Sequence, residues 1–174
     1  MREVYLRLCD WLADTSRFAI QVLMVVMTVD VLVGVFFRYV VGDALSWTEE
    51  TARYTMIWMG FFGAGLALRE GSHAAVELLL DSLPMGAHRV MVTVIRVLSL
   101  LFLLTVVGAG VVLVGRVSSQ TTPVLGISMM WPYLAVPIGC LLTALEMVAL
   151  MLRDPQGQRL HVGPARPVAR EPGG

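Results

Sequence analysis

The sequence predicts an all-α integral membrane protein: a four-helix bundle with a short amphipathic helix lying in the plane of the membrane. Hydrophobic residues make up 57% of the 174 residues and charged residues only 15%, whereas a soluble domain carries about 45–50% and about 25%. The apolar residues are gathered in four long runs separated by short polar stretches. The formal net charge is zero, which gives no indication of nucleic acid as a partner.

The four apolar runs predict four transmembrane helices within one domain, residues 1–152. A helix needs about 20 mostly apolar residues to cross a bilayer. We expect the spans at residues 18–41, 50–68, 90–116 and 130–152. The second is the shortest, the third contains the uncharged stretch VLSLLFLLTVVGAGVVLVG, and the fourth is interrupted by Glu146. Because the connections are short, we expect neighbouring helices to be antiparallel.

The segment SHAAVELLLDSL, residues 72–83, predicts the in-plane helix. Its leucines recur at helical spacing on one face, while Glu77 and Asp81 fall on another. Twelve residues are too few to span a bilayer, so we expect this helix in the interface, against lipid or another protein. Residues 153–174 are rich in proline, glycine and arginine, which predicts a disordered tail.

Arginine placement predicts the orientation of the chain. All 13 basic residues are arginine, and most lie in the N-terminal segment, in the loop after the second run and in the tail. The positive-inside rule therefore predicts that both termini and the middle loop are cytoplasmic. Trp47 and Trp131 then lie at the outer boundary, where interfacial aromatic residues are expected.

The stretch RYVVGDALSWTEETARY, residues 38–54, is the most charged part of the outer side. SWTE predicts a capping box in which Ser46 and Glu49 satisfy each other's backbone N–H groups. The two adjacent glutamates either pair with Arg53 on the same helix, or meet a partner protein or the arginine that opens the stretch. The candidate partner contacts here are Arg38, Asp43, Trp47, Glu49, Glu50 and Arg53.

Small residues mark one face of the second run. Gly60, Gly63 and Ala64 are also candidate partner contacts, because small residues allow close approach of helices in lipid. The alternative is packing within the chain's own bundle.

Asp30 is an acid inside the first run, and an acid at this depth is a functional hypothesis. We favour a structural or partner-facing hydrogen bond over ion transport, because no second acid or histidine completes a relay. Ser99 and Thr105 could solvate it.

Catalytic patterns are missing from the sequence. There is no Ser-His-Asp set, metal-ligand spacing or phosphate loop, so we expect no enzyme activity, cofactor or metal. His73 and His88 could ligate haem, but they flank a loop, whereas haem ligands normally face each other within spanning helices.

Two blocks of the sequence carry a family resemblance. FFRYVVGDALSWTEETARYTMIWMGFFGAGLALREGSH, followed by QTTPVLGISMMWPYLAVPIG, resembles the small permease (DctQ-like) subunit of tripartite ATP-independent periplasmic (TRAP) transporters. Asp30 departs from the family pattern.

The resemblance implies a multi-pass protein of the bacterial inner membrane. It would scaffold a large DctM-like permease subunit, which holds the substrate and ion sites. It would also help to dock a periplasmic substrate-binding protein, for symport of an organic acid such as a dicarboxylate. The alternative is a haem-binding membrane anchor subunit of a respiratory dehydrogenase.

Overall fold

The computed structural model describes residues 2–70 and 85–154, and all six of its named elements are helical. They are α1 (Arg2–Phe36), the π-helical turn η1 (Phe37–Val41), α2 (Ser46–Glu70), α4 (Met85–Val117), α5 (Met130–Tyr133) and α6 (Ala135–Arg153). The predicted all-α membrane class is confirmed. The predicted in-plane helix at 72–83 lies outside the described residues, as does the predicted tail beyond residue 154.

The first helix is longer than a bilayer requires. With 35 residues and a rise of 1.5 Å per residue, α1 is about 52 Å long, whereas the hydrocarbon core is about 30 Å thick. We therefore expect its first turns to project beyond the apolar layer on the N-terminal side. At its other end η1 stops at Gly42, whose φ of 79° is left-handed and favours glycine. The chain then reverses into α2.

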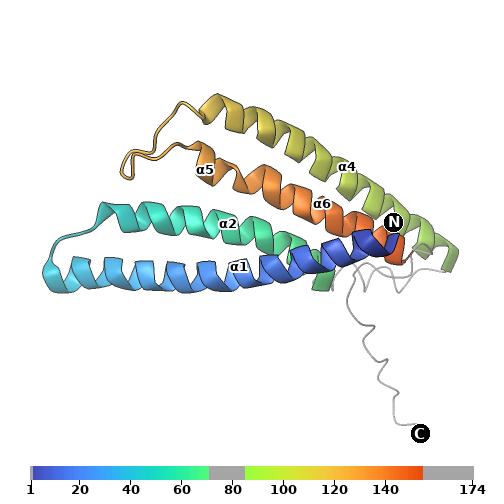
Figure 1. Cartoon of the computed structure of the whole chain (residues 1–174), viewed down its shortest axis with the longest axis horizontal. Helices are drawn as coiled ribbons and strands as arrows, with labels where there is room; N and C mark the ends of the chain where they lie inside the picture. The colour runs from blue at the N-terminus through green and yellow to red at the C-terminus, as the bar shows by residue number, and fades with distance from the viewer. Residues whose placement is uncertain (1, 71–84, 155–174) are drawn as a thin grey trace, which may run out of the picture.

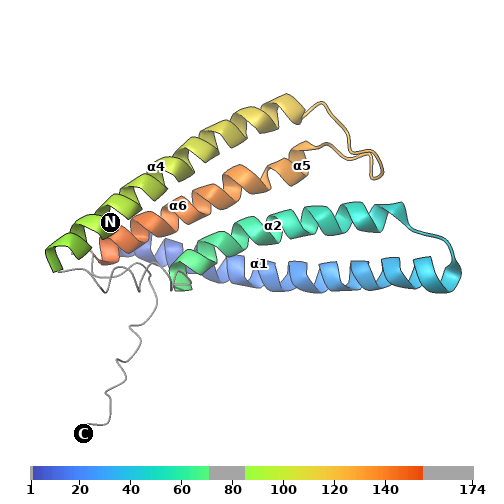
Figure 2. The same cartoon turned by 180° about the vertical axis from the view of Figure 1, so that it is seen from behind.

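The four long helices form a single layer. Figures 1 and 2 show them side by side in the order α4, α6, α2, α1. Helix α1 packs on α2, α2 on α6, and α6 on α4, whereas α1 and α4 make no contact within the described ranges. The N-terminal end of α1 also reaches α6. This arrangement leaves broad faces of α1 and α4 uncovered by the chain itself, while α6, one of the two central helices, has the largest share of buried residues among the four described long helices.

Close contacts between the inner helices depend on glycine. A Cβ atom at position 139 of α6 would lie 2.5 Å from the Phe61 Cβ of α2, and one at Gly110 of α4 would lie 3.1 Å from Pro137. Such small residues let helix backbones approach in lipid, where apolar burial alone does not drive association.

Three of the described helices are long and apolar enough to cross a membrane: Arg2–Val41, Ala87–Val117 and Met130–Arg153. They indicate a multi-pass membrane protein. Helix α2 is not among them, because glycine, threonine and arginine interrupt its apolar residues. It nevertheless lies between α1 and α6, so its neighbours cover part of its surface.

Candidate partner interface

At the end of the layer that the arginine distribution predicts to face outward, which we call the outer end, an ion pair joins η1 to α2. Arg38 donates to the carboxylate of Glu49, and their side chains are 50% and 61% exposed. Glu49 thus meets the arginine that opens the charged stretch, whereas the capping box predicted a bond with Ser46. Exposed pairs of this kind contribute at most about 1 kcal/mol to stability. The pair therefore serves the surface charge pattern more than the fold.

Glu50, the next residue, has a different environment. It is only 5% exposed, and its carboxylate accepts a hydrogen bond from the Tyr54 hydroxyl one turn further along α2. The other carboxylate oxygen accepts the backbone N–H groups of Val124 and Leu125 at 3.1 and 3.0 Å. Glu50 therefore links α2 to the segment between α4 and α5, and does not face outward as a partner contact would.

This segment folds into a small hairpin, residues 120–129, which we call the outer hairpin. Thr121 and Ser128 form an antiparallel bridge. The Thr122 N–H donates to the Ile127 carbonyl at 2.8 Å, and the N–H of residue 129 donates to the carbonyl of residue 120 at 2.9 Å. Gly126, with a φ of 65°, allows the turn. The backbone of the outer hairpin is therefore defined by its own bonds as well as by Glu50.

The remaining predicted outer contacts are accessible. Asp43 and Arg53 are exposed and form no ion pair with any residue in the described ranges, and Trp47 is 41% exposed. A hollow of about 240 Å³ lies between α1 and α2 just below the ion pair. Its lining is Val31, Gly34, Val35, Arg38, Tyr39, Thr48, Glu49 and Ala52.

The predicted small-residue face of α2 is open in this chain. Gly60 and Ala64 are exposed and Gly63 is half-buried. A Cβ atom at Gly60 or Gly63 would meet nothing within 4 Å, whereas one at Gly65 would lie 3.2 Å from the Thr143 hydroxyl. Packing within the chain therefore uses Gly65 and leaves the other two glycines uncovered.

Asp30 lies in a buried position of α1. It is 6% exposed, and neither carboxylate oxygen has a hydrogen-bond partner in the described part of the chain. The expectation that Ser99 and Thr105 solvate it is wrong, because both belong to α4, which lies at the opposite edge of the layer from α1. The Thr105 hydroxyl donates instead to the carbonyl of Leu101 in its own helix.

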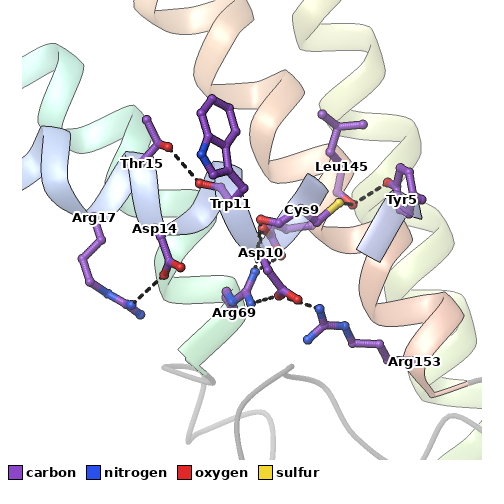
Figure 3. A network of polar contacts seen from close by, with 11 residues as sticks. Tyr5, Cys9, Asp10, Trp11, Asp14, Thr15, Arg17, Arg69, Leu145 and Arg153 are labelled. Atoms are coloured by element: carbon purple, nitrogen blue, oxygen red, sulfur yellow. Dashed lines mark hydrogen bonds and ion pairs between the residues drawn. The ribbon is translucent and has the colours of Figure 1, made fainter. Parts of the chain in front are cut away.

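At the opposite end, which we call the inner end, four charged side chains form a network that we call the inner polar cluster: Asp10, Arg69, Glu146 and Arg153. Figure 3 shows the bonds of Arg69 and Arg153 to Asp10. Arg69 donates to Asp10 and, at 3.1 Å, to Glu146, and Arg153 donates to Asp10 at 2.6 Å. The cluster joins α1, α2 and α6 with two positive and two negative groups. Its charges therefore balance within the chain.

Asp10 is the acid of the cluster that lies outside the predicted spans, whereas Glu146 lies within the fourth. Burial alone would raise the pKa of the Asp10 carboxyl. The hydrogen bonds from Arg153 and Arg69 outweigh burial and hold this pKa below its ordinary value. Nearby, Tyr5 donates to the Leu145 carbonyl at 2.9 Å. These contacts fix the N-terminal end of α1 against α6.

A second ion pair fixes the end of α6 to α4. Arg96, whose side chain is 4% exposed, donates to the Asp154 carboxylate at 2.9 Å and to its carbonyl at 2.9 Å. Sequence reasoning did not find this pair or the inner polar cluster. The available signal was that acids and arginines occur at similar depths in the predicted helices.

No three His, Cys, Asp or Glu side chains in residues 2–70 and 85–154 are placed to hold a metal ion. Cys9 and Cys140 are both buried free thiols. His88 lies in the first turn of α4, and His73 falls outside the described residues.

Comparison with known proteins identifies a family. Residues 24–157 match the model for the DctQ component of tripartite ATP-independent periplasmic transporters. The chain is similar to the ectoine TRAP transporter small permease protein TeaB of Halomonas elongata, with 27% identity over 133 residues, 75% of this chain and 69% of the relative.

Two further relatives align over smaller parts of their own length. The C4-dicarboxylate TRAP transporter small permease protein DctQ of Rhodobacter capsulatus is 31% identical over 56% of this chain and 44% of the relative. The isethionate TRAP transporter permease protein DctMQ of Oleidesulfovibrio alaskensis is 28% identical over 72% of this chain, but only 19% of the relative. These relatives are transport subunits and give no support to the alternative of a haem-binding anchor.

Proposed function

This chain belongs to the DctQ family of TRAP transporter small permease subunits, and on that premise we propose that it braces a large permease subunit and helps to dock a periplasmic substrate-binding protein. The transporter would take up an organic acid, driven by an ion gradient. It would lie in the bacterial inner membrane, with both termini of this subunit in the cytoplasm. The arginine distribution supports this orientation.

The bracing role is supported first by the single layer of helices. A layer buries its central helix but leaves two broad faces to its surroundings, so a second membrane protein can cover one of them. The match to DctMQ points the same way, because the aligned part is only 19% of that protein. A region similar to this chain is there joined to a much longer polypeptide.

The observation that carries the proposal is the open face of α2. This helix is less apolar than its neighbours, yet Gly60 and Ala64 stand exposed in its middle. Contact with lipid alone gives no use for a glycine there, since glycine costs about 1 kcal/mol relative to alanine in a helix. Contact with another helix does give a use for a glycine, because the missing side chain lets the two helix backbones approach closely. We therefore assign this face to the large subunit.

Docking of the binding protein is supported by the charged outer end. Arg38, Asp43, Glu49 and Arg53 present charges of both signs at the surface. Charges at the edge of an interface steer the approach of a soluble partner and select its orientation.

The transported substrate is inferred only by class. The names of the three relatives specify ectoine, C4-dicarboxylates and isethionate.

Co-purification tests the bracing role. We expect that Gly60→Leu with Gly63→Leu abolishes recovery of the large subunit with this one, because two leucines would hold the helices apart. The control is Val111→Leu with Val112→Leu on α4, which also adds bulk at two exposed positions, 59% and 55% exposed, but at residues that are not small. The control should keep the complex. Normal recovery with the α2 variant would contradict the assignment, provided that both variants accumulate in the membrane.

A further inference from the structure

The outer hairpin ends in an exposed tip that carries no charge. Val124, Leu125 and Ile127 are 49%, 37% and 41% exposed, and no charged residue occurs between Arg116 and the end of the hairpin. Apolar side chains on a loop outside the predicted spans need an explanation, because exposed apolar patches with polar surroundings mark interaction sites.

The backbone of this tip is held in one conformation from two sides. The ladder bonds within residues 120–129 define the two arms. The N–H groups of Val124 and Leu125, at the tip itself, both donate to one carboxylate oxygen of Glu50. A connection between two helices, or a loop resting among lipid headgroups, does not require such a fixed shape. A protein contact benefits from it, because less conformational freedom is lost on binding.

The surroundings of the tip also fit a protein contact. Glu50 lies in the first turn of α2, so the tip rests against the end of α2 that also carries the exposed Arg53, whereas Glu49 pairs with Arg38 on the α1 side. An apolar centre with a charged rim is the usual anatomy of a protein–protein interface. The tip lies at the outer end of the layer, on the side away from the inner polar cluster (Figure 1).

We infer that the tip of the outer hairpin is the surface on which this subunit contacts the soluble substrate-binding protein, and that Glu50 is the residue that positions it. The inference rests on the proposed docking function and adds to it a specific surface. Glu50 is buried and does not itself reach the partner. Glu50 acts through the hydrogen bonds that its carboxylate accepts from the two backbone N–H groups of the tip.

A photo-crosslinking experiment tests the surface. A photoreactive amino acid replaces Val124 in the complete membrane complex in lipid nanodiscs, and the binding protein of the same transporter is added. The control position is Val111, which is 59% exposed on α4 within a predicted span. We expect a crosslink to the binding protein from position 124 and none from position 111. Crosslinks from position 124 only to the large subunit or to lipid would overturn the inference.

A binding titration tests the role of Glu50. Glu50→Gln removes the charge that strengthens the bonds to the hairpin, while Asp14→Asn removes the charge of an exposed acid at the other end of the helix layer. We expect Glu50→Gln to weaken binding of the binding protein roughly tenfold, and Asp14→Asn to leave it unchanged. Equal effects of the two variants would show that the bonds of Glu50 to the hairpin do not matter and would overturn the positioning role.

The two proposals can fail separately. If Val124 gives no crosslink to the binding protein while this subunit still co-purifies with the large one, the hairpin inference fails and the bracing role stands. If the α2 variant Gly60→Leu with Gly63→Leu keeps the complex while Val124 still crosslinks, the bracing face is wrong and the hairpin surface stands.

Discussion

Arg69, at the end of α2, donates a hydrogen bond of 3.1 Å to Glu146 in the middle helix α6. Both side chains are largely shielded, with 17% and 8% of their surface exposed. Arg69 also donates to Asp10 of α1. One guanidinium therefore connects three helices at the inner end, as Glu50 connects α2 to the outer hairpin at the other end.

We expect Arg69→Met to lower stability by about 3 kcal/mol, because it leaves Glu146 buried without its cation. For a protein of this length this corresponds to a fall of about 6–12 °C in the thermal midpoint. The measurement is thermal unfolding of the purified subunit in detergent, followed by tryptophan fluorescence.

The double variant Arg69→Met with Glu146→Met is the control for this prediction. It removes both charges and should recover much of the loss, since apolar replacements of a buried pair are often tolerated. A double variant that is no more stable than Arg69→Met alone would show that the pair is not the source of the effect.

The pH dependence of stability should report Asp10. Its pKa is lower in the folded protein than its ordinary value, although burial opposes this, because Arg153 and Arg69 donate to it. Its contribution is therefore complete above its ordinary pKa of about 4, and is lost as the pH falls through the lower, folded value. The difference in thermal midpoint between the native protein and Asp10→Asn should stay constant from neutral pH to about pH 5, then shrink towards zero.

Asp14→Asn is the control for Asp10. Asp14 pairs with Arg17 on the exposed surface of the same helix, with side chains 74% and 47% exposed, and such pairs contribute little. Its variant should differ little from the native protein at any pH. A difference for Asp10→Asn that persists undiminished at pH 3 would contradict the prediction.

The sequence was sufficient to predict the helical membrane class, and three of the described helices are long and apolar enough to cross a bilayer. In lipid every backbone N–H and C=O group must form a hydrogen bond within the protein, so a long apolar run has few alternatives to forming an α-helix. The charged outer stretch was also recognised, and Glu49 meets Arg38 only 11 positions away. Local spacing of this kind can be read from the chain because few competing partners lie so near.

The arrangement of the helices was not predictable in the same way. The bonds of the inner polar cluster join residues 59, 77 and 143 positions apart, and these pairings depend on which helices are neighbours. Hydrophobic periodicity does not specify neighbours when lipid and protein are equally apolar. The role of Glu50 was missed for the same reason, because its partners lie 74 and 75 positions away.

Gly139→Ala should destabilise the isolated subunit. The added Cβ would lie 2.5 Å from the Phe61 Cβ and 3.0 Å from its backbone, so α2 and α6 must move apart. Overpacking of this kind costs about 1–3 kcal/mol. Gly60→Ala is the matched control, because its Cβ would meet nothing within 4 Å. It should leave the thermal midpoint of the isolated subunit unchanged or higher. Equal midpoints for the two variants would contradict the close contact of the helices.

Asp30→Asn should leave the thermal midpoint of the subunit unchanged or raise it. The carboxyl group is 6% exposed, and its oxygens have no hydrogen-bond partner among the described residues. An unpaired carboxylate in such a place costs several kcal/mol, and asparagine has nearly the same shape without the possibility of that charge. The change therefore removes an electrostatic cost without opening a cavity. The measurement is again thermal unfolding in detergent.

Asp30→Ala separates the effect of shape from the effect of charge. Alanine also removes the charge but leaves a void where the carboxyl group packed, and such voids are destabilising. We therefore expect the thermal midpoint of Asp30→Asn to be higher than that of Asp30→Ala and no lower than that of the native protein. If Asn falls as far as Ala, the carboxylate itself is required, as it would be if Asp30 bound a cation within the membrane. The same two variants in the assembled transporter would then show whether uptake depends on that charge.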